Sequence, residues 1–157
     1  MPKFTDPQLA AMKAAANADS TAAAFIIGGN DTQLIDWFNA ANVKVVWRSV
    51  LTPELSRAAI VKGASQLDAL TAGKRDALLY LAQGTLNVTD PNVRAAIDDL
   101  CGSQNTLKAS FVDAEKRTAT NAESALATGT GTVAAPSYLA WEGQITSQDV
   151  TDIRGAA

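Results

Sequence analysis

The chain has 157 residues, with 13 basic and 16 acidic side chains and a formal net charge of −3. It contains no histidine and one cysteine, Cys101, which excludes Ser-His-Asp and Cys-His catalysis, histidine-bound metals and an intrachain disulfide. Neither a basic stripe nor a long apolar run is present, which argues against nucleic-acid binding and membrane insertion. The length predicts one ordinary domain.

Hydrophobic residues make up 47% of the chain, but aromatic residues only 6%. Much of the hydrophobic fraction is alanine, which favours helices over bulky cores. Composition therefore predicts a mainly α fold. We expect a small multi-helix bundle with one short extended segment and a C-terminal arm that contains a small β or irregular element.

Three dipeptides predict helix N-termini: Asp6-Pro7, Thr52-Pro53 and Asp90-Pro91. In each, an Asp or Thr oxygen can accept a hydrogen bond from a free backbone N–H, and proline is already preset for the first turn. Glycines mark the ends where apolar periodicity stops, at Gly28, Gly29, Gly63, Gly84, Gly102 and Gly129.

Apolar residues spaced three and four apart predict the helical faces between these marks. The clearest faces are Leu34, Trp37, Phe38 and Ala41, and Val93, Ala96, Ile97, Leu100 and Cys101. A leucine-rich helix is expected over 74–83. Thr120 and Glu123 have the spacing of a capping box and predict a helix that runs to about residue 127.

Two segments depart from the helical pattern. Residues 43–50 are rich in β-branched side chains, which favours an extended segment. The Thr- and Gly-rich residues 128–137 are typical of an irregular linker. We therefore expect a helical domain over 1–127, a linker over 128–137 and an arm over 138–157, with a short helix from Thr146 to Ile153.

The arm carries large apolar side chains that a disordered tail would lack. We take Tyr138, Leu139, Trp141 and Ile145 as candidate partner-binding residues. Two alternatives are open: the arm folds back onto its own helical body, or it inserts into another subunit or protein. If it binds a partner, truncation after Ala127 should leave a folded body.

The sequence gives little support for any catalytic group. The Gly-Thr repeat at 129–132 lacks a lysine and follows a helix, so it does not fit a phosphate loop. Nothing in the spacing brings two carboxylates into a cleft, and Asp98 and Asp99 are expected on a solvated flank. Cys101 is predicted to be a small buried hydrophobe. We predict no catalytic, metal or cofactor residues, and no enzyme; a small enzyme that uses Asp and Lys groups is a remote alternative.

Several segments together resemble a family of small structural proteins from tailed bacteriophages. They are residues 1–11, 45–49, 92–97, 116–123 and 127–136, followed by Trp141-Glu142-Gly143. The resemblance covers nearly the whole chain and is most specific in the last third, where the Thr-Gly repeat precedes Trp-Glu-Gly. Asn121 and Ser124 stand where other members often have arginine and a bulkier residue.

The resemblance implies a virion component that is assembled in the cytoplasm of the bacterial host. The leading hypothesis is a head-to-tail connector or neck protein, similar to adaptors, which forms a ring by non-covalent contacts with portal or tail components. The polar start of the chain and its lone cysteine agree with cytoplasmic assembly. The alternative is another phage role: tail completion, association with the capsid, or a tail-assembly chaperone.

Overall fold

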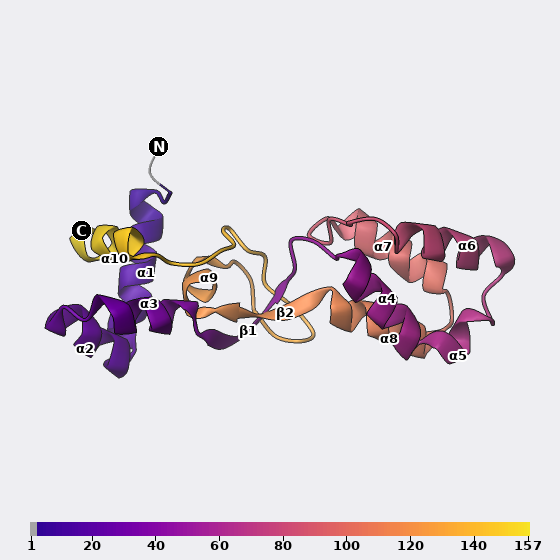
Figure 1. The fold of residues 1–157 in the computed structure, drawn as a ribbon, viewed down its shortest axis with the longest axis horizontal. Coiled ribbons are helices and arrows are strands. Elements are labelled where there is room, and N and C mark those ends of the chain that lie inside the picture. Colours follow the sequence, from indigo (N-terminus) through magenta and orange to yellow (C-terminus); the bar gives the residue numbers. More distant parts are fainter. Residues whose placement is uncertain (1–2) are drawn as a thin grey trace. The chain divides into compact units, whose positions relative to one another are not determined.

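The structure, a computed structural model, describes residues 3–157, so Met1 and Pro2 of the opening segment lie outside it. The predicted fold class is confirmed, because the described chain is mainly helical and has a small two-stranded antiparallel sheet (Figure 1). Ten helices lie within these residues.

The chain is divided into two compact units. Unit 1 comprises the residues up to Val46 together with Thr118–Ala157, and unit 2 comprises Trp47–Arg117. This division differs from the predicted single domain over 1–127, because the end of the chain packs with its beginning. Each unit has its own cluster of buried apolar side chains.

Unit 1 is built from helices of the first and last parts of the chain. These are α1 (Asp6–Ala18), α2 (Ser20–Gly28), α3 (Asp31–Asn39), α9 (Asn121–Leu126) and α10 (Ser147–Gly155). Helix α10 packs on α1 and α3. The buried cluster consists of Phe4, Met12, Ala16, Ala22, Leu34, Phe38, Ala122, Leu126, Ile145, Val150 and Ile153.

Unit 2 consists of consecutive helices. These are α4 (Pro53–Lys62), α5 (Ala64–Leu67), α6 (Ala72–Leu81), α7 (Pro91–Cys101) and α8 (Asn105–Ala114). Helix α8 packs closely on α4, and a Cβ atom at Gly63 would lie only 2.6 Å from the Leu107 Cα atom. The buried cluster consists of Leu51, Ala59, Leu70, Leu78, Val88, Ile97, Cys101, Leu107 and Phe111. The prediction of a buried Cys101 is confirmed.

The predicted helix starts depend on local hydrogen bonds that the structure shows. The Asn92 backbone N–H donates to Asp90 Oδ1 over 2.8 Å, and the Thr120 N–H donates to Glu123 Oε2 over 2.9 Å. Thr52 caps α4 in the same way. Helix α1 begins one residue earlier than predicted, since Thr5 occupies the N-cap and Asp6 is already helical.

The sheet pairs β1 (Ala41–Trp47) with β2 (Lys116–Thr120). Strand β1 confirms an extended segment, but it starts earlier than residue 43, so Ala41 belongs to the strand and not to the preceding helical face. Strand β2 was not predicted, because Lys116 and Arg117 fit a helix end equally well. Its short polar sequence becomes a strand through pairing with β1 rather than through its own propensity.

Candidate functional site

The structure places Ile145 in the buried core of unit 1 and packs the half-buried Trp141 against that core. Ile145 is only 2% exposed. Its backbone N–H donates to Asn39 Oδ1 over 2.8 Å, and its carbonyl accepts from Asn39 Nδ2 over 3.0 Å. The Trp141 ring meets the Phe4 ring edge-on, with centroids 5.0 Å apart. These side chains are therefore satisfied within the chain.

An ion pair holds the same region together. The Lys3 Nζ atom lies 2.7 Å from Asp149 Oδ2, donates to the Gln144 carbonyl over 2.7 Å, and lies 5.0 Å from the Trp141 ring centroid. Burial pushes the pKa of Asp149 upward, but hydrogen bonds from Lys3 and Thr146 outweigh it, so the pKa lies below its usual value. The ionised carboxylate therefore stabilises the folded unit.

The other two arm residues lie closer to the surface. Tyr138 is 42% exposed and Leu139 is half-buried. The predicted linker is irregular, yet its backbone is paired at both ends: Thr128 and Tyr138 exchange two hydrogen bonds of 3.0 and 2.9 Å, and the Ser137 N–H donates to the Val45 carbonyl over 2.9 Å. The sequence left two alternatives open for the arm. The contacts of Trp141 and Ile145 show that this part of the arm folds back onto its own chain. Tyr138 keeps a surface that a partner can contact.

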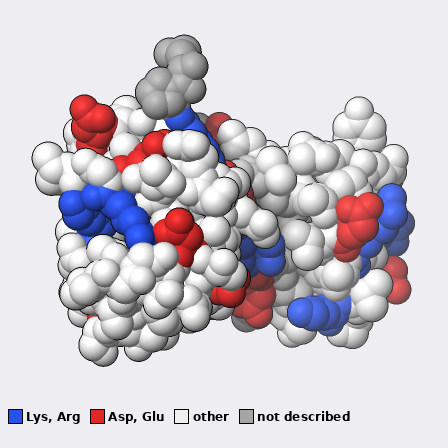
Figure 2. Space-filling view, turned by 60° about the vertical axis from the view of Figure 1, so that its left-hand side comes forward, with Lys and Arg blue, Asp and Glu red and all other residues white. Residues whose placement is uncertain are grey.

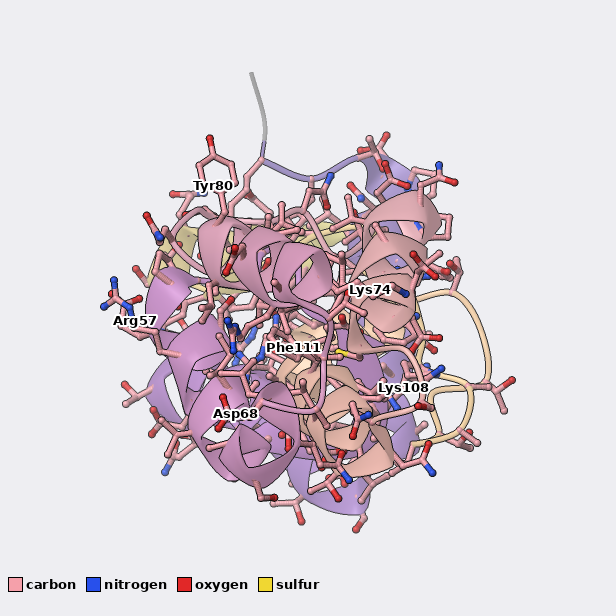
Figure 3. The ribbon with its side chains drawn as sticks, turned by 90° about the vertical axis from the view of Figure 1, so that its right-hand side faces the viewer. Arg57, Asp68, Lys74, Tyr80, Lys108 and Phe111 are labelled. Carbon is pink, nitrogen blue, oxygen red and sulfur yellow. The ribbon has the colours of Figure 1, made fainter. Side chains whose placement is uncertain are left out.

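A larger apolar surface lies on unit 2, where the sequence did not lead us to expect one. Val61 on α4 and Tyr80 on α6 are 74% and 76% exposed, and Leu79 is 37% exposed. Figure 3 shows Tyr80 and Arg57 projecting outward, whereas Phe111 lies among the helices. A groove of about 470 Å³ here is lined by Arg57, Ile60, Val61, Leu79, Ala82 and Gln83. We call Val61, Leu79, Tyr80 and this groove the α4–α6 surface.

Unit 2 also contains a cavity of about 270 Å³ between α7 and α8. It is lined by Trp47, Arg94, Ala95, Ile97, Asp98, Cys101, Lys108, Phe111, Val112 and Glu115. The Arg94 guanidinium lies over the Trp47 ring, 4.1 Å from its centroid, which holds the ring in place. Lys108 forms an ion pair with Asp98 at the surface.

Glu115 is the unusual group of this cavity. It follows the last residue of α8 and is 2% exposed. Burial raises the pKa of its carboxyl group to about 7; Arg94 and Lys116 act in the opposite direction, and Asp98 adds to the rise. Burial, together with nearby carboxylates, also raises the pKa of Cys101, to about 11. The thiol therefore stays protonated and is a poor nucleophile.

Charges elsewhere are mixed. In the view of Figure 2, acidic and basic side chains are interspersed on a largely uncharged face, and no field of one sign dominates it. Within residues 3–157, no group of three or more acidic or cysteine side chains converges as a metal site would require. No helix in this part of the chain has the length and apolar character needed to cross a membrane.

Comparison with known proteins gives no relative: no family model, curated protein or solved structure matches the chain. Sequence reasoning missed the α4–α6 surface, although the run from Leu78 to Leu81 carries more apolar residues than one buried helix face can use. For Glu115 the sequence offers no such signal, because its burial depends on which helices pack around it.

Proposed function

We propose that the chain is a non-enzymatic structural component of a tailed-phage virion, at the head-to-tail connector or neck. It would act by non-covalent assembly into a ring that contacts portal or tail components. The resemblance in the sequence motivates the phage assignment. The α4–α6 surface is the observation that carries the assembly role, because clustered exposed apolar side chains on a soluble chain usually mark a protein interface.

A second copy of this chain is the partner that we assign to the α4–α6 surface. Ring assembly needs two different patches on each copy, since a head-to-tail contact joins one patch to the other. Unit 1 also exposes large apolar side chains, with Ile27 on α2 at 87% and Val43 on β1 at 93%. The chain thus carries an apolar groove on one unit and protruding apolar side chains on the other.

The binding free energy expected for one such contact is small, so the contact becomes stable only when it is repeated around a ring. Full burial of one large aliphatic or aromatic side chain contributes roughly 1.5–3 kcal/mol. A contact centred on Val61, Leu79 and Tyr80 is therefore weak for one pair once the entropic cost of association is included. Closure of a ring adds the second contact of each copy at a high effective concentration, which stabilises the whole assembly.

The test compares Val61→Asp with the control Val50→Asp by mass photometry and light scattering of the full chain. Val50 is also exposed, at 44%, but lies outside α4 and α6. We expect the wild type and the control to form oligomers with rising concentration, and Val61→Asp to remain monomeric. A monomeric wild type at high concentration, or equal effects of the two substitutions, would contradict the assembly role.

A density map of the virion tests where in the particle this chain lies. Density for this chain at the neck would agree with the proposal. Density at the capsid or the tail tip, or a chain that leaves the particle after assembly, would instead assign one of the other phage roles.

A further inference from the structure

Unit 1 has a cavity of its own, formed by the end of α1 together with residues of α3, β1 and α9. Its volume of about 370 Å³ lies within the range of small-molecule sites, roughly 300–1,000 Å³. The wall combines one tryptophan with small and polar residues: Ala15, Ala18, Asp19, Trp37, Asn42, Asn121, Ser124 and Ala125. A wall with this many polar groups favours a ligand that forms several hydrogen bonds.

Hydrogen bonds fix the orientation of the two asparagine amides in this wall. Asn42 Nδ2 donates to Asn121 Oδ1 over 2.6 Å, and Asn121 Nδ2 donates to the Trp37 carbonyl over 2.7 Å. Asn42 Oδ1 accepts from the Lys44 backbone N–H over 3.0 Å, so this amide is held at both ends. Each amide nitrogen carries two hydrogens, and each of these contacts uses one. A second N–H of each amide is therefore held ready for a ligand.

The charge of the wall favours a neutral ligand. Among the described lining residues Asp19 alone is charged, and its carboxylate caps α2: Oδ1 accepts from the Thr21 and Ala22 N–H groups, each over 2.9 Å. The partial positive charge at the start of a helix offsets this carboxylate. The other polar side chains are amides and a hydroxyl, which offer hydrogen bonds without charge. A charged ligand would lose its hydration here for little compensation.

The single tryptophan distinguishes between two kinds of neutral ring. Trp37 is half-buried, packs against the core of unit 1, and meets the Phe38 ring edge-on with centroids 5.1 Å apart, so its position is fixed. A flat base has two apolar faces and would need a second apolar wall. A sugar ring has one face of C–H groups, which suits the negative face of an aromatic ring, and a rim of hydroxyl groups that suits polar side chains.

We propose that this cavity binds one pyranose ring of a neutral saccharide, with the C–H face of the sugar on Trp37. The sugar hydroxyls accept from the amides of Asn42 and Asn121, and donate to the Asp19 carboxylate. A free monosaccharide and a sugar unit of a longer glycan offer the same chemistry. The site lies within unit 1, separate from the α4–α6 surface, and does not depend on the proposed assembly role.

The first test compares neutral sugars with a ring that lacks their hydroxyl groups. The probes are the methyl glycosides of glucose, galactose and mannose, with tetrahydropyran and uracil as controls. Binding to the full chain is followed by calorimetry and by the NMR signal of the Trp37 indole N–H. We expect at least one glycoside to bind at millimolar concentration and to shift this signal. No glycoside binding, or equal or tighter binding of tetrahydropyran or uracil, would overturn the proposal.

The second test removes one wall contact at a time. Asn42→Ala should weaken binding of the glycoside about threefold to tenfold, because a hydrogen bond is lost. Asn17→Ala, at an exposed position of α1 outside the cavity wall, should leave it unchanged. Trp37→Leu should abolish binding, whereas Trp141→Leu, which changes another half-buried tryptophan packed on the same core, should not. Equal effects of a variant and its control would contradict the assigned contacts.

The third test fills the cavity without removing any contact of the fold. Ala18 lines the cavity and is exposed at the end of α1, so Ala18→Phe should block the glycoside while the circular dichroism spectrum stays that of the wild type. Asn17→Phe is the matched control and should bind normally. Unchanged binding in Ala18→Phe would overturn the proposal. Tighter binding of maltotriose than of every methyl glycoside would assign the site to a glycan, and equal binding to a free monosaccharide.

Discussion

Replacement of Glu115 by glutamine tests how unit 2 tolerates a buried carboxylate. The pKa of this group is raised from 4.5 to about 7, and each unit of pKa corresponds to about 1.4 kcal/mol. Ionisation of Glu115 therefore costs the folded state about 3 kcal/mol. Glutamine has nearly the same shape and cannot ionise, so Glu115→Gln should remove this cost.

The sign of the effect follows from which state holds the proton. Below pH 4.5 the carboxyl group is protonated in both states and does not make the stability depend on pH. Between pH 4.5 and about 7 the unfolded chain releases the proton first, so the free energy of unfolding of the wild type falls as pH rises. Above this window the loss is complete. Glu115→Gln should therefore gain about 3 kcal/mol relative to the wild type across the window.

Urea unfolding at several pH values, followed by circular dichroism and tryptophan fluorescence, measures this difference. Asp113→Asn is the matched control, because Asp113 is exposed near the end of α8, two residues before Glu115. The reasoning is refuted if the stability curves of the wild type and Glu115→Gln run parallel from about pH 4.5 to about 8, or if the control shows the same gain.

Three further predictions concern unit 1 and the backbone. Truncation after Ala127 removes Ile145, Val150 and Ile153 from the core, so we expect unit 1 to unfold and hydrogen-exchange protection to survive only in unit 2; a fully protected truncated chain would contradict this packing. Asp149→Asn should lower the free energy of unfolding by about 1–3 kcal/mol near neutral pH. Urea unfolding at acid pH should show no difference from the wild type, because a lowered carboxyl pKa gives stability that is lost as pH falls. Gly143→Ala should lower the melting temperature, since the φ of Gly143 is 151° and a Cβ atom there would lie 2.9 Å from the Trp141 ring. Gly73→Ala should raise the melting temperature, because the position has open space around it and lies in α6, where alanine is the better helix former. Shifts of the same sign in the two variants would refute this reasoning.

The C-terminal segment shows where local patterns stop being informative. The capping box of α10, Thr146 with Asp149, could be predicted because its partners are three residues apart. The hydrogen bonds between Asn39 and Ile145 span 106 residues, and no local spacing indicates them. The same holds for strand β2, whose polar sequence pairs with β1 only in the folded chain.

The sequence by itself determined the helical class, the starts of α1, α4, α7, α9 and α10 to within one residue, and the buried position of Cys101, because these depend on hydrogen bonds and apolar spacing within a few residues. Only the tertiary structure decided the division into two units, the burial of Ile145, the packing of Trp141 against the core of unit 1, and the exposure of Val61 and Tyr80. It also created the buried carboxylate of Glu115. Burial depends on which distant segments pack together, and a chain rich in alanine allows many such packings with similar local patterns.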